Sequence, residues 1–160
     1  MTRVGLGSDL HRTIPGDHVM LGGVRVPAPF GVAAHSDGDV LLHAVTDAVV
    51  GALAAGDIGE LFPDTAAENR GRASADFLAA ALALAHRRGY AVGNLDCVVA
   101  LEKPKLSPHK KAIAASLARL LHTAPENVSV KAKTAEGLGP IGEGRAIAAQ
   151  AMILLVARGD

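Results

Sequence analysis

The first strand-like stretch of the chain reads RVGLGSDLH, from Arg3 to His11. Its residues alternate in polarity or size, which predicts a β-strand with two distinct faces. Residues two positions apart on a strand point to the same face, so Asp9 and His11 are expected to converge. A carboxylate and an imidazole provide half of a site for Zn²⁺, Mn²⁺ or Fe²⁺. A polar pair at the end of a strand, facing solvent, has the same spacing.

A helix is expected to follow the stretch HSDGDV, residues 35–40. Ser36 or Asp37 provides the N-cap, and the helix runs over residues 40–55 and stops at Gly56. The free N–H groups at its start favour an anion nearby.

On this helix Asp39, His43 and Asp47 are spaced by four residues and share one face. The same face carries Gly51, which permits close approach of another backbone. A lone histidine in an apolar helix is commonly a hydrogen-bonded core residue. The sharper hypothesis is that His43 joins the Asp and His of the first strand as a third metal ligand, giving an open catalytic site.

Strands and helices are interspersed along the rest of the chain. This order predicts one domain over residues 1–160, of class α/β or α+β, with a small mixed β-sheet. Further strands are expected at 90–101, 128–133 and 146–156, helices at 73–88 and 108–122, a hairpin at 19–27, and loops at 56–72 and 136–144.

Composition excludes several classes of protein. Lys plus Arg and Asp plus Glu each number 16, so the net charge is zero, and only 2% of residues are aromatic. Both values argue against a general nucleic-acid binder. Cys97 stands alone, which excludes an internal disulfide and fits a reducing compartment. The apolar stretch 146–157 contains Gln150 and is shorter than the about 20 residues of a membrane helix, so we expect a cytoplasmic protein.

Two later clusters could meet a phosphorylated ligand. The stretch KPKLSP, residues 103–108, suits recognition of a base or phosphate, although it would also serve as a solvated basic helix start. The stretch KTAEGLG, residues 133–139, offers a hydroxyl and a carboxylate suited to Mg²⁺, or it is an ordinary turn. The sequence contains no convincing nucleophile–base pair, Walker loop or dinucleotide fingerprint. The residues therefore support a metal-assisted reaction on a phosphorylated small molecule.

Taken together, these motifs resemble one family closely, the 2-C-methyl-D-erythritol 2,4-cyclodiphosphate synthases of the non-mevalonate isoprenoid pathway. The resemblance extends in order over nearly the whole chain. Its matching pieces are GSDLH (7–11), LGGV (21–24), HSDGDV (35–40), HAVTD (43–47), GDIGELFPDT (56–65), KPKL (103–106) and VKAKTAEGLG (130–139).

The resemblance implies a ferredoxin-like subunit with helices on one face of the sheet, assembled as a homotrimer with active sites between subunits. It implies a phosphorus–oxygen lyase acting on 4-diphosphocytidyl-2-C-methyl-D-erythritol 2-phosphate. The 2-phosphate of this substrate attacks the β-phosphorus, CMP leaves, and the 2,4-cyclodiphosphate forms. The nucleophile then belongs to the substrate, and the protein supplies positioning and charge neutralisation.

The resemblance also assigns residues. Asp9, His11 and His43 would hold Zn²⁺, and Glu136 would hold a second divalent ion, Mg²⁺ or Mn²⁺. His35 and Thr134 would stabilise the transition state. Spacing alone suggests Asp47 as a hydrogen-bond partner of a ligating histidine. The substrate-binding positions are Ser36, Asp57, Gly59, Phe62, Asp64, Lys103, Pro104, Lys105, Leu106, Ser107, Lys133, Thr134 and Glu136.

One departure concerns the loop after Leu138-Gly139. Family members often carry Arg followed two residues later by Glu, whereas this chain has Glu143 and then Arg145, and Pro140 replaces a frequent aromatic or aliphatic residue. In the family these positions belong to a central cavity reported to hold isoprenoid diphosphates, not to the chemistry. The reversed order could preserve an ion pair.

Two other functions use the same residues. A metal-dependent phosphohydrolase would use the three ligands to activate water and would release phosphate. A non-catalytic trimer would bind nucleotides or isoprenoid diphosphates without turnover, although such a binder has little need of two metal sites.

Overall fold

The computed structural model describes residues 1–34, 36–63 and 72–158. Its main sheet has the strand order β4-β1-β7-β5-β6, and a separate two-stranded sheet pairs β2 with β3. Only β5 and β6 run parallel, so the sheet is mixed. The strands are β1 (Thr2–Ile14), β2 (His18–Leu21), β3 (Val24–Pro27), β4 (Gly31–Val32), β5 (Tyr90–Ala100), β6 (Val128–Lys133) and β7 (Ala146–Ala157).

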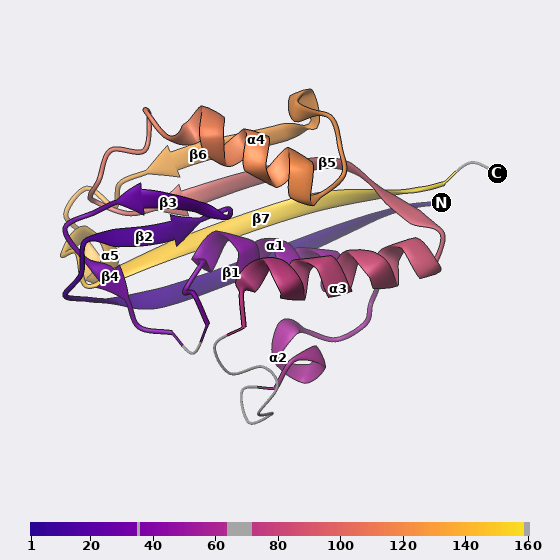
Figure 1. The fold of residues 1–160 in the computed structure, drawn as a ribbon, viewed down its shortest axis with the longest axis horizontal. Coiled ribbons are helices and arrows are strands. Elements are labelled where there is room, and N and C mark those ends of the chain that lie inside the picture. The colour runs from indigo at the N-terminus through magenta and orange to yellow at the C-terminus, as the bar shows by residue number, and fades with distance from the viewer. Residues whose placement is uncertain (35, 64–71, 159–160) are drawn as a thin grey trace.

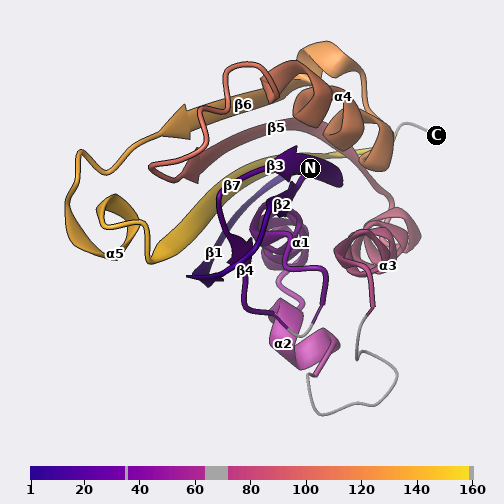
Figure 2. The same ribbon diagram turned by 60° about the vertical axis from the view of Figure 1, so that its left-hand side comes forward.

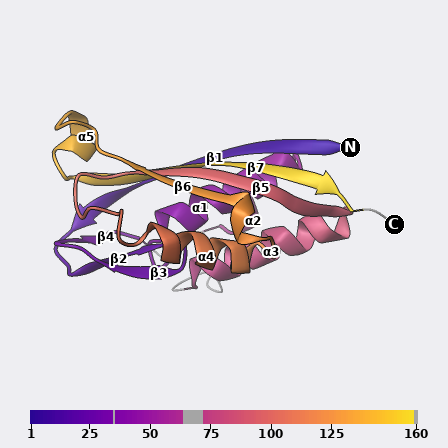
Figure 3. The same ribbon diagram turned by 90° about the horizontal axis from the view of Figure 1, so that it is seen from above.

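The helices between residues 40 and 120 gather on one face of this sheet together with the β2–β3 hairpin (Figures 1 and 3). They are α1 (Val40–Ala52), α2 (Ile58–Leu61), α3 (Ser74–Arg87), α4 (Lys110–Leu120) and α5 (Gly139–Gly142), with a 3₁₀ turn at Pro125–Asn127. The prediction of a mixed α/β subunit with helices on one face is confirmed. Among the described residues, none of the helices has the length and apolar character needed to cross a membrane.

Helix α1 lies unusually close to β1, in the middle of the molecule (Figure 2). A Cβ added at Gly5 would come within 1.8 Å of the Ala48 carbonyl oxygen, and one at Gly7 within 2.0 Å of the Ala44 carbonyl oxygen. The strand therefore needs glycine at both positions. A Cβ at Gly51 would meet only the Leu6 carbonyl oxygen, at 3.8 Å. The prediction that Gly51 allows the close approach is wrong, because the glycines of β1 allow it.

The N-cap of α1 is Asp39, not Ser36 or Asp37 as predicted. Its buried carboxylate accepts hydrogen bonds from the N–H groups of Leu42 (2.9 Å), Gly22 (2.9 Å) and Gly23 (2.7 Å). Burial raises the pKa of Asp39 and outweighs the opposing effect of these hydrogen bonds. One side chain thus joins the β2–β3 turn to the start of α1.

Two predicted loops contain short helices. The stretch 56–72, expected to be irregular, includes α2, which is capped by Asp57. The glycine-rich stretch 136–144 includes α5. Both helices have four residues, too few to produce a periodic apolar pattern.

On the opposite side of the sheet, the described part of the chain places only the short helix α5, at the end where β7 begins, and the strands are otherwise uncovered (Figure 3). Large apolar side chains point outward there from β1 and β7: Val4, Leu6, Leu10 and Met152 are 60%, 64%, 61% and 51% exposed. Leu6 and Met152 are paired across the two strands, so they form one continuous patch. A contiguous apolar patch of this kind is typical of an interface.

Candidate active site

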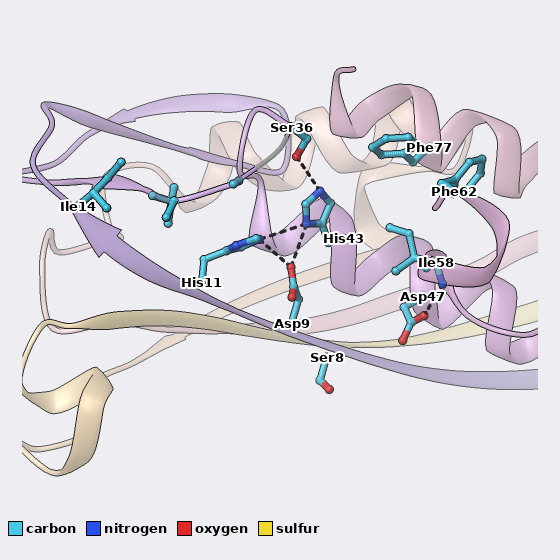
Figure 4. A pocket seen from close by; sticks show the side chains of 14 residues that line it. Ser8, Asp9, His11, Ile14, Ser36, His43, Asp47, Ile58, Phe62 and Phe77 are labelled. Atoms are coloured by element: carbon cyan, nitrogen blue, oxygen red, sulfur yellow. Dashed lines mark hydrogen bonds and ion pairs between the residues drawn. The ribbon is translucent and has the colours of Figure 1, made fainter. Parts of the chain in front are cut away.

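The three predicted metal ligands lie together where β1 passes α1 (Figure 4). Asp9 Oδ2 is 2.9 Å from His11 Nε2 and 2.9 Å from His43 Nδ1, and the two ring nitrogens are 3.2 Å apart. The strand presents Asp9 and His11 on its helix-facing side, and α1 presents His43. The convergence expected for positions i and i+2 of a strand is therefore present.

Within this cluster, Asp9 and His11 shift the pKa values of each other. Partial burial pushes the pKa of Asp9 upward, but hydrogen bonds with His11 and His43 outweigh it, and the pKa lies well below its usual range. The hydrogen bond to Asp9 raises the pKa of His11, against the opposing effect of burial. Asp9 is therefore ionised at neutral pH and attracts positive charge, whether a proton or a metal ion.

The donor set fits a divalent metal ion. One carboxylate oxygen and two imidazole nitrogens, each able to supply a lone pair, lie within 4.8 Å of one another. Two histidines and one carboxylate make a typical open site for zinc, in which a further position is left for water or substrate.

The cluster forms the polar end of a pocket of about 660 Å³. Its remaining wall is largely apolar, with Ile14 on one side and Ile58, Phe62 and Phe77 on the other (Figure 4), and Val32 also lines it. The rings of Phe62 and Phe77 contact each other, with centroids 4.9 Å apart. The pocket could accommodate a small molecule with an anionic end at the cluster and an apolar group against the rings.

The second ring nitrogen of His43 has partners that spacing did not reveal. Nε2 lies 2.9 Å from Ser74 Oγ and 3.2 Å from Ser36 Oγ, and the Ser74 hydroxyl donates to Asp37. Asp47, predicted as the partner of a ligating histidine, instead accepts a hydrogen bond from Ile58 N at 3.1 Å. That prediction is wrong, because the Asp47 carboxylate binds the start of α2.

The predicted binding residues of the α2 region lie beside this pocket. Gly59 and Phe62 line it. Asp57 accepts a hydrogen bond from Glu60 N at 2.8 Å and so caps α2. His35 and Asp64 lie outside the described residues, and their predicted roles stay predictions.

The other predicted binding residues lie around the ends of β5 and β6. Lys103, Lys105 and Ser107 are exposed, Pro104 is half-buried, and Leu106 is buried in the core. Lys133 and Thr134 are exposed at the end of β6, where Thr134 Oγ1 donates to Glu136 Oε1 at 2.7 Å.

Glu102 joins these two loops, and sequence reasoning missed it. Its carboxylate accepts a hydrogen bond from Ala135 N at 2.6 Å. The KPKL stretch and the TAE stretch are therefore held side by side at one edge of the sheet.

Within one chain these two groups of residues are separated. The metal-ligand cluster is on β1, the second group follows β5 and β6, and β7 and β5 lie between β1 and β6. Three strand spacings amount to about 14 Å. None of the second group lines the pocket beside His43.

The chain matches the model of the YgbB family over residues 2–156. It is 49% identical to the 2-C-methyl-D-erythritol 2,4-cyclodiphosphate synthase of Rhodopirellula baltica over 156 residues, covering 98% of this chain and 94% of that protein. The synthase of Xylella fastidiosa is 52% identical over 153 residues, covering 96% and 87%.

A solved structure of IspF from Plasmodium falciparum in complex with CDP superimposes with a TM-score of 0.87 and is 37% identical. The match covers 99% of this chain and 97% of that one. Sequence and fold agree over nearly the full length, and the chain belongs to the YgbB family.

Proposed function

We propose that this protein is a 2-C-methyl-D-erythritol 2,4-cyclodiphosphate synthase. It converts 4-diphosphocytidyl-2-C-methyl-D-erythritol 2-phosphate to the cyclodiphosphate and releases CMP. The observation that carries this proposal is the Asp9–His11–His43 cluster at the end of a substrate-sized pocket, in a chain about half identical to synthases along its whole length. The reaction breaks one phosphorus–oxygen bond without water, so the enzyme is a phosphorus–oxygen lyase.

Asp9, His11 and His43 would hold Zn²⁺, and Glu136 would hold a second divalent ion, Mg²⁺ or Mn²⁺; when bound, these ions would supply Lewis acidity toward the phosphate oxygens. The converging lone pairs of the cluster fit the first ion. The exposed Glu136 carboxylate, with Thr134 beside it, has the oxygen chemistry that suits the second.

The chain's own residues position the substrate. Ser36 and the pocket wall at Gly59 and Phe62 receive the methylerythritol 2-phosphate end. The apolar surface there suits the methyl group and carbon backbone, while Ser36 offers a hydroxyl to a phosphate oxygen. Asp57, and by resemblance His35 and Asp64, complete this end. The displacement is intramolecular, and holding the 2-phosphate against the β-phosphorus removes the conformational freedom of the chain between these two groups before they react.

The loops after β5 and β6 receive the cytidine and its phosphates. Lys103, Lys105 and Lys133 add positive charge, and Thr134 offers a hydroxyl to the developing charge in the transition state. Pro104, Leu106 and Ser107 shape the base site. Binding of CDP by the P. falciparum relative supports a nucleotide at such a position.

The separation of the two groups supports active sites shared between subunits, and the family resemblance implies that the assembly is a homotrimer. A diphosphate substrate must touch both the His43 pocket and the Thr134 loop, which one chain holds apart by two intervening strands. A neighbouring copy can supply the second group. The outward patch of Val4, Leu6, Leu10 and Met152 provides apolar surface for such contacts.

The proposal includes a cytoplasmic protein whose single domain covers residues 1–160.

Glu143 and Arg145 form an ion pair, with Arg145 Nε donating to Glu143 Oε2 at 2.7 Å. The charge pairing is therefore kept despite the reversed order.

Phosphorus NMR tests the reaction directly. The purified protein is incubated with the diphosphocytidyl methylerythritol 2-phosphate and Mg²⁺, with and without EDTA. We expect stoichiometric CMP and a cyclic diphosphate, both abolished by EDTA. Inorganic phosphate would identify a hydrolase instead, and the absence of turnover by zinc-loaded protein would favour a binding trimer.

A further inference from the structure

The strands β5 and β6 run parallel and lead into the two loops that carry the second group of predicted binding residues (Figure 1). Ala100 pairs with Lys133 at the end of this ladder, and Leu101 N donates to the Lys133 carbonyl at 3.0 Å. In a regular parallel ladder the next hydrogen bond would run from Ala135 N to the Leu101 carbonyl. This N–H instead donates to the side chain of Glu102, at 2.6 Å. Glu102 thus replaces a ladder bond where the two chains leave the sheet.

Ala135 is the first residue of a tight turn with an unusual backbone. Leu138 N donates to the Ala135 carbonyl at 2.9 Å and closes the turn. Its two central residues, Glu136 and Gly137, have φ values of 53° and 76°. A glutamate rarely adopts this left-handed conformation, which persists only where surrounding contacts hold it. The hydrogen bond to Glu102 is one of the contacts that hold the turn.

The same turn carries the two groups that the proposed reaction needs at the diphosphate. Thr134 Oγ1 donates to Glu136 Oε1 at 2.7 Å, so the hydroxyl and the carboxylate are held together. Both residues are exposed, and their mutual contact does not fix where they lie relative to the base loop. The half-buried Glu102 provides that link. It directly precedes Lys103, and it binds the residue between Thr134 and Glu136.

Glu102 acts through a hydrogen bond and not through an ion pair. In the part of the chain that the structure describes, no lysine or arginine forms a salt bridge with its carboxylate, although Lys103 and Lys105 follow it in the same loop. Its negative charge would repel the phosphates of a nucleotide. Glu102 can therefore aid their binding through the geometry that it imposes, and an amide at this position would impose the same geometry.

We propose that Glu102 is a positioning residue for the reaction, which holds the turn of residues 134–138 at a fixed spacing from the loop of residues 103–107. A nucleoside diphosphate places its base on one loop and its phosphates on the other, so a change in this spacing loses one set of contacts. Fixing both loops before binding also lowers the cost of ordering them. This inference rests on the nucleotide site of the proposed function, but the contact between Glu102 and Ala135 is a property of the ligand-free protein.

Two substitutions of Glu102 separate its hydrogen bond from its charge. Glu102→Ala removes the acceptor of the Ala135 N–H. Glu102→Gln removes the same charge, but the amide oxygen of glutamine can still accept from this N–H. Glu126→Ala is the matched control, because Glu126 is an exposed glutamate in the 3₁₀ turn at the opposite end of β6.

Two measurements are made on the full-length protein. Hydrogen exchange of the Ala135 amide, followed by NMR, monitors the contact without any ligand, and isothermal titration calorimetry gives the affinity for CDP with and without Mg²⁺. We expect Ala135 to exchange faster than in the wild type in Glu102→Ala alone.

With Mg²⁺ present, the CDP affinity of Glu102→Ala should be about tenfold lower than that of the wild type, the effect of one hydrogen bond to a charged group. The affinity should change less than about threefold in Glu102→Gln and in Glu126→Ala. The gain in affinity on adding Mg²⁺ should also be smaller in Glu102→Ala, because Glu136 is no longer held toward the diphosphate.

Unchanged CDP affinity or unchanged Ala135 exchange in Glu102→Ala would overturn the inference. An equal loss of affinity in Glu102→Gln would overturn it too, because the effect would then belong to the charge. An equal loss in Glu126→Ala would do the same by showing a general effect on β6. If the wild type binds no CDP while Ala135 exchange rises in Glu102→Ala alone, the proposed nucleotide site is refuted and the contact that fixes the turn stands.

Discussion

At the scale of single residues, three side chains form the metal-ligand cluster, and each has a defined neighbour. Asp9 contacts both imidazoles of the cluster, and His43 bonds on its other side to Ser74. Because these contacts connect two elements, the loss of one ligand removes a metal-binding atom without emptying the core.

His43→Ala should abolish zinc binding and reduce the rate more than about 100-fold, since the loss of a ligand exceeds the effect of an outer partner. Metal analysis of the purified protein and the phosphorus NMR assay measure both. Cys97→Ser is the control: the buried thiol, whose pKa burial raises to about 12, takes no part in the site and should keep the rate within a few fold. Full zinc content in His43→Ala would contradict the assignment.

The Asp9–His11 contact makes the stability of the metal-free protein pH-dependent. The pKa of His11 is raised in the folded state, so its contribution is complete below the unfolded value of about 6.5 and is lost as pH rises through the raised pKa. The lowered pKa of Asp9 acts in the other direction: its contribution is present above about 3.8 and is lost as pH falls.

Urea unfolding in EDTA measures this dependence. As the pH rises above the unfolded value of about 6.5, the free energy of unfolding of the wild type should decrease, because His11 loses its proton. Asp9→Asn removes the charge that raises the His11 pKa, so this variant should show a flatter profile. Parallel profiles for the two proteins would mean that the contact does not affect proton binding.

At the scale of elements, the position of α1 decides whether the site exists. The helix rests on the bare backbone of β1 at Gly5 and Gly7, and its start is tied to the β2–β3 turn through Asp39. The glycines of β1 and the Asp39 hydrogen bonds together fix how far His43 lies from the strand that carries the other ligands.

Gly7→Ala should lower stability by about 3 kcal/mol, at the upper end of the cost of overpacking, since the new methyl group would overlap the Ala44 carbonyl. It should also weaken Co²⁺ binding by moving α1 outward. Gly51→Ala is the matched control, because the added methyl meets only an ordinary contact and alanine favours a helix by up to about 1 kcal/mol. Chemical denaturation and Co²⁺ titration measure the two effects. A Gly7→Ala variant with unchanged stability and Co²⁺ affinity would contradict the close approach of α1 to β1.

Asp39→Ala should lower the free energy of unfolding by about 3 kcal/mol, because three N–H groups lose their acceptor in a buried place. The exposed Asp76, in the first turn of α3, pairs only loosely with Arg72 at 3.9 Å. Asp76→Ala should therefore change stability by less than about 0.5 kcal/mol. Equal effects of the two substitutions in urea unfolding would refute the role given to Asp39.

At the scale of the whole molecule, the sheet has one covered face and one open face. The helices cover one side, and the other presents the patch of Val4, Leu6, Leu10 and Met152. One half of the proposed site lies on β1, next to the edge strand β4, and the other follows β5 and β6 toward the opposite edge. We therefore expect the two halves of one site to come from neighbouring copies.

Mixing two inactive variants tests this arrangement. His43→Ala damages the metal half and Thr134→Ala the nucleotide half, so each alone should be nearly inactive. After subunit exchange at equal amounts, about a quarter of the interfaces in a cyclic trimer would combine two intact halves, and activity should return to that level. Light scattering of each sample should give the mass of a trimer. A mixture no more active than its components would show that both halves act within one chain.

The sequence by itself determined the mixed α/β class, the long strands and helices, and the ligands Asp9, His11 and His43. It could do so because alternation and helical periodicity are local, and because a metal site needs particular donor types. Only the tertiary structure decided that Asp39 caps α1, that Asp47 serves α2, and that Ser74 and Asp37 stand behind His43. These partners are chosen by which elements pack together, and residue spacing does not encode contacts between segments that are eleven to thirty-seven positions apart.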